Sequence, residues 1–338
     1  MSSLTIRNHT FTWGSQTYVM GILNATPDSF SGDGLVGRAG EGLDTLRYST
    51  SDETEGLDTL RYSTGDETEG LDTRRYSTGD DWWVHAALEQ GRRFVAEGAH
   101  ILDVGGESTR PGSQPVDAAE ELRRVLPVIA GLAATVDVPI SIDTSKAAVA
   151  KAALAAGASI VNDVWGLRLD PPIAQVAALA GAPVILMHNR SQREHVTIDP
   201  ALGGRYVGTA YADLLGDIAA ELQISIDLAR RAGIPAAHVI LDPGIGFGKT
   251  VAQNLELLDR LGELRGLGYP ILAGPSRKSF IGYTLDLPSD QRVEGTAAAV
   301  AIAIARGADI VRVHEVQAMA RVARMADAIV RRGRYHSG

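Results

Sequence analysis

Short apolar runs alternate with longer amphipathic stretches along most of this chain. The runs are rich in β-branched side chains, as in HILDV, PISID and PVILMH, which is typical of buried strands. The stretches between them place apolar residues at the spacing of a helix that packs against a core. Because the runs are apolar almost throughout, they indicate parallel strands that are covered on both faces.

This pattern predicts eight strand–helix units. The strands are expected at 18–23, 100–104, 139–143, 159–164, 183–188, 238–242, 270–274 and 309–314. The helices are expected at 82–97, 117–134, 145–156, 171–180, about 206–232, 253–265, 292–306 and 316–331. Eight such units favour an α/β fold, a closed (β/α)8 TIM barrel, over an open sheet. Residues 4–17 alternate around a Trp-Gly-Ser turn and predict an N-terminal β-hairpin that closes one end of the barrel.

A repeat interrupts the pattern after the first barrel strand. The copies GLDTLRYSTSDETE, GLDTLRYSTGDETE and GLDTRRYSTGD begin at residues 42, 56 and 70. Each offers only Leu and Tyr as apolar groups, which is too little to form a core. We interpret 35–81 as a flexible insertion within a single domain that spans 1–338. A tract that binds a partner is the alternative interpretation.

Composition agrees with a globular protein of one large barrel or two domains. The chain has 338 residues, of which 45% are hydrophobic. Its net charge of −9 argues against a nucleic-acid partner, and no apolar stretch is long enough to span a membrane. The sequence has no cysteine and no secretory signal pattern, which excludes disulfides and thiolate metal sites. We therefore expect a cytoplasmic location.

A polar or charged group stands at the end of every predicted strand. In a barrel of this kind, the carboxyl ends of the strands form one mouth, where the active site lies. The residues are Asn24, Asp103, Asp143, Asn162, His188, Asp242, Ser276, Lys278, Arg312 and His314. Polar loops explain any one of them, but a whole set that converges on one mouth predicts an active site.

The residues at the mouth separate into two kinds of chemistry. The middle strands carry Asp143, Asn162 and Asp242, which suit a planar group rich in N–H donors and acceptors. A buried carboxylate is costly unless a donor pair meets it, and an aminopyrimidine edge supplies such a pair. The sequence therefore predicts a planar, nitrogen-rich end of the substrate.

Cations gather on the last two strands, where barrels of this type commonly bind phosphate. Lys278, Arg312 and a protonatable His314 lie there, so we expect an anionic, phosphorylated end of the substrate. Asn24 would offer an oxygen near the phosphates, which suits a Mg²⁺ ion that keeps most of its waters.

Other signals are weaker. The stretch PGIGFGKT resembles a phosphate loop, but Pro243 stands where that loop needs Gly, and the glycines miss the dinucleotide-binding spacing. We interpret it as a flexible turn with Phe247 near the pocket. The remaining carboxylates and histidines of note are interpreted as solvated, helix-start, packing or surface residues: Asp28, Asp33, Glu120, Glu121, His85 and His100.

Through these motifs the chain resembles the dihydropteroate synthase family. The matching stretches are MGILNATPDSFSGDG, DVGGESTRPG, SIDTSKAAV, NDVWG, ILDPGIGFGK, GPSRKSFIG and VRVHEV. The resemblance covers 18–316 apart from the insertion. It implies a transferase of folate biosynthesis that joins 6-hydroxymethyl-7,8-dihydropterin diphosphate to 4-aminobenzoate and releases pyrophosphate. It also implies a homodimer.

The resemblance assigns roles to the candidate residues. The pterin would be held by Asp143, Asn162, Asp242 and Lys278. The diphosphate would be held by Thr109, Arg312 and His314, with Asn24 on Mg²⁺. The aminobenzoate would lie near Arg110, Phe247 and Ser276. The candidate catalytic residues are Asn24, Asp103, Asp143, Asp242, Lys278, Arg312 and His314.

The chain departs from the family pattern at three places. Asn189 and Arg190 follow His188, where Met and Gln are more common, and Glu315 stands where Asp is usual. The insertion lies in a loop that the resemblance implies closes over the site, so we expect it to alter substrate affinity more than chemistry. Deletion of 42–69 tests this.

Two other functions remain open from the sequence. One is a methyltetrahydrofolate-dependent methyltransferase with a corrinoid partner, which would not need the STRPG, SRK and Arg-x-His motifs present here. The other is a relative that binds pterin without condensing it, and the loss of a key residue would favour it. No such loss is seen in the sequence.

Overall fold

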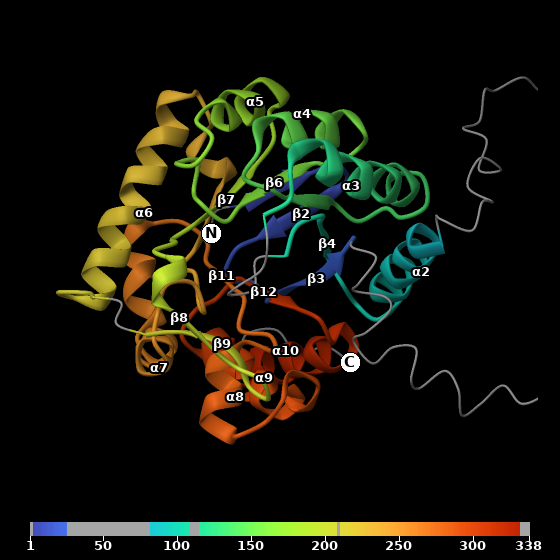
Figure 1. Ribbon diagram of the computed structural model, residues 1–338. Coiled ribbons are helices and arrows are strands. Elements are labelled where there is room, and N and C mark those ends of the chain that lie inside the picture. The colour runs from blue at the N-terminus through green and yellow to red at the C-terminus, as the bar shows by residue number, and fades with distance from the viewer. Residues whose placement is uncertain (1–2, 26–81, 109–114, 208–209, 332–338) are drawn as a thin grey trace, which may run out of the picture.

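The computed structural model describes residues 3–25, 82–108, 115–207 and 210–331. Within them, eight parallel strands stand side by side in the order β10-β7-β6-β5-β4-β3-β12-β11, with helices around them (Figure 1). A parallel bridge between Leu241 and Ile271 joins the two ends of this sheet. The predicted (β/α)8 barrel is confirmed.

The element bounds agree closely with the sequence pattern. The barrel strands are β3 Tyr18–Asn24, β4 Ile101–Gly105, β5 Ile140–Asp143, β6 Ile160–Asp163, β7 Val184–Met187, β10 Val239–Asp242, β11 Leu272–Ala273 and β12 Ile310–Val313. The helices are α2 Trp82–Ala96, α3 Ala118–Ala133, α4 Ala147–Ala155, α5 Pro172–Ala180, α6 Leu214–Arg231, α7 Val251–Asp259, α8 Ser279–Leu285, α9 Val293–Ala305 and α10 Val316–Val330.

Three segments differ from the prediction. The helix expected from about 206 begins only at Leu214, because an antiparallel pair, β8 Val196–Asp199 and β9 Gly203–Tyr206, comes before it. The turn of this pair depends on Asp199, whose side chain accepts from the N–H groups of Ala201 and Leu202. The short helix α8 follows β11 without a strong pattern of its own, and the helix expected at 253–265 ends earlier and continues as the 3₁₀ helix Leu261–Leu267.

The predicted N-terminal hairpin is present as β1 Ser3–Ile6 and β2 His9–Thr12. Its turn lies between these strands, where Arg7 has φ 53°, and the expected Trp-Gly-Ser turn comes after β2. Phe11 and Trp13 pack with the innermost strand residues, among them Met20. The hairpin therefore closes the amino-terminal end of the barrel, as expected.

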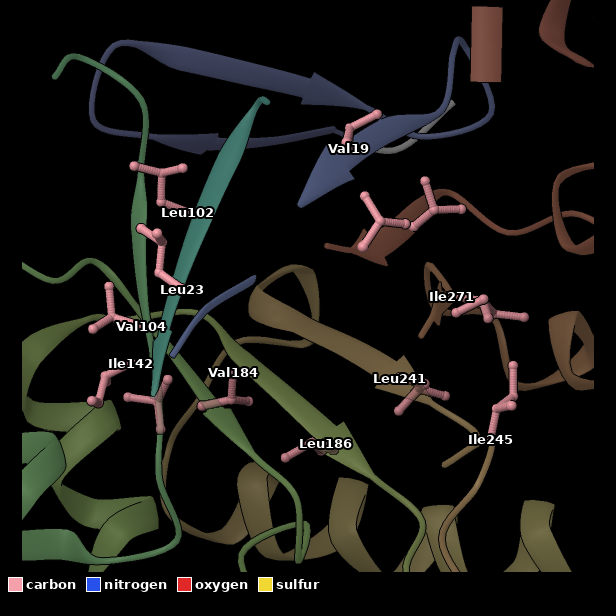
Figure 2. Close-up of a cluster of buried hydrophobic side chains, with 14 of the residues drawn as sticks. Val19, Leu23, Leu102, Val104, Ile142, Val184, Leu186, Leu241, Ile245 and Ile271 are labelled. Atoms are coloured by element: carbon pink, nitrogen blue, oxygen red, sulfur yellow. The ribbon is translucent and has the colours of Figure 1, made fainter. Parts of the chain in front are cut away.

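Alternation along each strand separates the core from the site. Figure 2 shows side chains such as Val19, Leu23, Leu102 and Val104, which belong to the large core between strands and helices. The intervening positions face the barrel interior, where Met20 and its neighbours fill the amino-terminal end. Because successive side chains point to opposite faces, the polar residues near the strand ends also face inward.

Asp309 joins the hairpin to the closure of the barrel. Its side chain is 1% exposed, and its two oxygens accept from the N–H groups of Gly14 (2.9 Å) and Ile271 (3.1 Å). Asp309→Ala leaves both donors without this partner, so we expect the free energy of unfolding to fall by about 3 kcal/mol in urea titrations. The matched control is Asp259→Ala, which removes an exposed partner of Arg306 and should change it by less than about 1 kcal/mol. Equal effects of the two variants would contradict this role of Asp309.

The assignment of 1–338 as one domain stays a prediction, and the insertion at 35–81 lies outside the described residues. No helix among the residues with described positions is long and apolar enough to cross a membrane.

Candidate active site

The barrel interior carries a cluster of charged groups toward the carboxyl ends of its strands. Arg312, on β12, donates from Nε to Asp103 and from a terminal nitrogen to Asp143, both at 2.6 Å. Asn162 also donates to Asp103, at 3.1 Å. Because Asp103, Asp143 and Asn162 lie on β4, β5 and β6, this cluster connects four strands across the barrel.

Burial controls the charges of this cluster. Desolvation raises the pKa of Asp143 to about 7, and the neighbouring Asp103 adds to this shift, whereas the Arg312 guanidinium opposes it. The same carboxylates hold the pKa of Arg312 above its usual range, against the desolvation that burial causes. The Asp103 side chain is fully buried, and its Oδ1 has no hydrogen-bond partner among the described residues. The cluster therefore has capacity for one more donor, which a bound ligand can supply.

A second group of residues surrounds Asp242, at the end of β10. Its Oδ1 accepts from the Gly244 N–H at 2.7 Å. Burial raises the pKa of the carboxyl, and the nearby Lys278 is the strongest influence that lowers it. The ammonium group of Lys278 lies 4.1 Å from the centre of the Phe247 ring and donates to the Ile245 carbonyl. Desolvation lowers the pKa of Lys278 to about 7.

Phe247 belongs to a small apolar wall beside these charges. It packs with Val164 and Met187, and the half-buried Trp165 packs against them. A planar ligand bounded by this wall and by Asp242 would meet apolar surface on one side and hydrogen-bonding groups on its edge, the usual design of a small-molecule site.

Ser276 and His314 form the third part of the site. The Ser276 hydroxyl lies 3.0 Å from Nδ1 of His314 and accepts from the His314 backbone N–H at 3.2 Å. Glu315 accepts from Ser276 at 3.4 Å and is paired with Arg277. The loop after β11 is thereby held against the loop after β12.

Comparison with known proteins identifies the family. Residues 72–314 match the profile of a family described as pterin binding enzyme. The chain is 42% identical over 323 residues to the dihydropteroate synthase of Bacillus subtilis, covering 96% of this chain and 92% of that protein. The dihydropteroate synthase of Synechocystis is 44% identical over 322 residues, covering 95% and 93%. This chain belongs to the dihydropteroate synthase family.

Solved structures of this family agree. A crystal structure of the Clostridium difficile dihydropteroate synthase in the presence of pteroic acid has a TM-score of 0.75 and 42% identity, covering 95% of this chain and 99% of that chain. The Xanthomonas albilineans enzyme with 4-aminobenzoic acid has a TM-score of 0.74 and 36% identity, covering 97% and 98%. The family inferred from the motifs is confirmed, and the synthase is favoured over the methyltransferase alternative.

The structure brings together most residues that were predicted for a dihydropteroate synthase site. Arg312, expected as a grip on diphosphate, already pairs with two carboxylates. Asn24 is half-buried at the end of β3. Thr109 and Arg110 lie outside the described residues, so their assignment stays a prediction.

Two interpretations of the weaker signals were right only in part. Glu121 stands in the first turn of α3, as expected of a helix-start residue, but it is not solvated: it is 1% exposed and accepts from Lys146 at 2.5 Å, and Glu107 accepts from the same ammonium group. The PGIGFGKT segment is the expected turn, with Phe247 beside the site, but hydrogen bonds from Lys249, which is 2% exposed, hold it where flexibility was expected. A lysine among glycines and apolar residues was the only sequence signal for this burial.

The histidine at the start of β4 was interpreted correctly. His100 accepts from the Val19 N–H at Nδ1 (3.0 Å), and its ring meets the Tyr18 ring edge-on. Burial lowers its pKa, so it packs as a neutral side chain. It lies at the opposite end of the barrel strands from the Asp143 cluster and takes no part in the site.

Proposed function

We propose that this chain joins 6-hydroxymethyl-7,8-dihydropterin diphosphate to 4-aminobenzoate, forming 7,8-dihydropteroate and pyrophosphate. The observation that carries the proposal is the convergence of buried carboxylates and cations around Asp143, Asp242 and Arg312. Such a set can bind a nitrogen-rich ring and an anionic leaving group at the same time.

The pterin would lie against the Phe247 wall with its donor-rich edge on Asp242 and Asn162. Both side chains are buried and face the barrel interior. A ligand with paired N–H groups would supply the donor that stabilises a charged Asp242 in this dry environment. The Lys278 ammonium would hold an acceptor on the same ring system.

Charge stabilisation would carry the reaction. When the bond between the pterin methylene carbon and the diphosphate oxygen breaks, the bond electrons leave with pyrophosphate and positive charge spreads into the pterin ring. Asp143 and Asp242 favour that positive charge, while Arg312 and His314 would face the departing anion. The amine of 4-aminobenzoate then forms the new carbon–nitrogen bond and releases a proton to solvent. This reaction needs no covalent enzyme intermediate, so the Ser276 hydroxyl and the His314 ring, 3.0 Å apart, are not given the roles of nucleophile and base.

Magnesium is proposed as the cofactor. Asn24 offers an amide oxygen at the carboxyl end of β3, and no group of three or more acidic or histidine side chains among the described residues is arranged to hold a metal. This donor set fits an ion bound by one protein ligand, water and substrate phosphate, the usual situation of Mg²⁺ beside phosphates. When bound, the ion would neutralise charge on the leaving diphosphate.

The second substrate and the assembly complete the proposal. Ser276 and Phe247, with Arg110 outside the described residues, would border the 4-aminobenzoate. The Xanthomonas albilineans relative was solved with 4-aminobenzoic acid, which supports this substrate.

A cytoplasmic homodimer is also proposed: the adjacent helices α9 and α10 expose the apolar side chains of Ile302 and Met325, which a second copy can cover. Sedimentation at equilibrium measures this association.

The test is formation of dihydropteroate by the purified chain from the two substrates, with Mg²⁺. We expect product that requires both substrates and that EDTA abolishes and excess Mg²⁺ restores. Calorimetry with each substrate alone separates binding from turnover. Pterin binding without any product would instead favour the non-catalytic relative.

Pterin binding should weaken at basic pH because of Lys278. Its pKa of about 7 means that the ammonium loses its proton as the pH rises through neutrality. If the charged form holds the pterin, the dissociation constant should rise by about tenfold per pH unit above the pKa. Calorimetry from about one pH unit below that pKa to about two units above it measures the dissociation constant over this range. In Lys278→Met the affinity should be lower and lose this pH dependence, whereas a persistent slope would assign the limit to another group.

A further inference from the structure

Lys249 is buried in the wall of the barrel beside the proposed pterin site. It is 2% exposed, and it is one of the largest fully buried side chains among the described residues. Its Nζ donates to the carbonyl oxygens of Gly244 (2.9 Å) and Phe247 (3.1 Å), and it lies 2.9 Å from Nδ1 of His188. Three acceptors match the three protons of an ammonium group.

Other charged groups around Lys249 fit this arrangement. Burial and the Lys249 charge lower the pKa of His188 to about 4, so a neutral His188 ring accepts at Nδ1. Its Nε2 lies 3.2 Å from Glu221, which also pairs with Arg190. Desolvation lowers the pKa of Lys249 well below its usual value, and the nearby Asp242 is the strongest influence that opposes this shift. The three acceptors around Nζ also favour the protonated form, because hydrogen bonds to a charged group stabilise it.

The segment 243–249 needs this support because of its backbone shape. Gly244, Gly246 and Gly248 all have positive φ, at 70°, 81° and 57°. A Cβ at Gly244 would lie 1.9 Å from the His188 carbonyl oxygen, so the segment packs against the loop after β7 with no space for a side chain. A chain of glycines has many alternative conformations, and the hydrogen bonds of Lys249 select one of them.

The fixed segment supplies three contacts to the site. The Gly244 N–H donates to Asp242, the Ile245 carbonyl accepts from Lys278, and the Phe247 ring lies beneath the Lys278 ammonium. The hydrogen bonds that Lys249 Nζ donates within the described part of the chain go to the two residues that flank Ile245 and Gly246 and to the His188 ring, and none goes to Lys278 or Asp242. Lys249 therefore acts on those residues through the shape of the segment, and on Asp242 also through its charge, which lowers the pKa of that carboxyl.

We propose that Lys249 is a positioning residue for the pterin half of the site: its three hydrogen bonds hold 243–249 in the shape that places Asp242, Lys278 and Phe247. This inference rests on the proposed function, because it takes these three residues to bind the pterin. It assigns to Lys249 no contact with substrate and no proton transfer.

The test is calorimetry of 6-hydroxymethyl-7,8-dihydropterin diphosphate binding to wild type and Lys249→Met, followed by steady-state kinetics. Met keeps most of the buried volume and removes all three donors. We expect the pterin dissociation constant to rise by about tenfold or more, the scale found for partners that orient a binding residue. The KM for 4-aminobenzoate should change less than the pterin dissociation constant, because Phe247 is the only one of its three proposed neighbours that lies on 243–249.

This split distinguishes positioning from general loss of structure. A variant that is partly unfolded would bind less pterin per chain and lower kcat, with both KM values unchanged. Lys151→Met is the matched control, since Lys151 is exposed on α4, and it should bind pterin like wild type. Lys249→Gln, which keeps two N–H donors, should fall between wild type and the Met variant.

Each outcome has a defined meaning. Wild-type pterin affinity in Lys249→Met overturns the inference while leaving the proposed function in place. If wild type itself does not bind pterin, the proposed function fails first. If the Met variant does not fold, Lys249→Gln decides: weaker pterin binding with a smaller change in the KM for 4-aminobenzoate supports positioning, and unchanged pterin affinity overturns it.

Discussion

Replacement of Arg312 by Ala is expected to lower kcat for dihydropteroate formation by roughly a thousandfold. The half-buried guanidinium joins Asp103 and Asp143 at 2.6 Å each, and it would face the departing pyrophosphate. Without it, charge that develops in the transition state loses a preorganised partner in a site with little water. Quenched-flow or steady-state product assays with saturating substrates measure the loss.

The same variant should also change the ionisation of the site. Asp143 has a pKa of about 7 even beside Arg312, and loss of the guanidinium removes the main influence that lowers it. The Asp143 pKa should therefore rise, so the carboxyl stays protonated to higher pH. Because a buried carboxylate without a partner is costly, the free energy of unfolding at neutral pH should fall by about 3 kcal/mol.

Two further variants test whether the loss depends on the guanidinium of Arg312. Arg312→Lys keeps a positive charge but cannot offer two donors in a rigid fork, so kcat should recover only in part. Arg306→Ala, which removes an exposed arginine paired with Asp259, should leave kcat unchanged. Turnover of Arg312→Ala within tenfold of wild type would contradict the role of Arg312 in charge stabilisation.

Replacement of Asp242 by Asn is expected to weaken pterin diphosphate binding by about 100-fold. The amide side chain of this variant would keep an acceptor for the Gly244 N–H, which in wild type donates to Oδ1 of the carboxylate. Its N–H₂ group would however face the N–H groups of the pterin edge, and the attraction of a charged acceptor would be lost. Calorimetry gives the affinity without dependence on turnover.

Asp309→Asn provides a matched control for this experiment. Asp309 is also buried, but its side chain accepts from the backbone N–H groups of Gly14 and Ile271 at the amino-terminal end of the barrel, away from the proposed site. Its substitution should lower stability and leave pterin affinity unchanged. If both variants bind pterin equally well, or lose affinity equally, then Asp242 does not recognise the N–H groups at the edge of the pterin.

The sequence alone was sufficient to predict the barrel architecture. Each strand carries its apolar residues in a run that must be covered on both faces, and the units repeat often enough to close a barrel. The inward positions of the site followed from the same rule, because residues such as Asp103 and Asp143 stand at alternate positions near strand ends. Period and spacing are local properties, and local properties can be read from a single sequence.

The pairing of charges could not be read in this way. Arg312 meets Asp103 and Asp143 across 209 and 169 residues of sequence, and no spacing rule connects them. The hairpin at 196–206 depends on the Asp199 side chain rather than on a strong turn dipeptide, and so no strands were predicted there. Glu121 and Lys249 look like surface residues by type, yet closure of the barrel buries both.

The sequence by itself determined the barrel, its family and the residues that line its mouth, because these depend on patterns within each strand–helix unit. Only the tertiary structure decided which of those charges pair, which are desolvated and how far their pKa values move. Those properties depend on distances between units that are far apart in the chain, and on the exclusion of water once the units have closed around them.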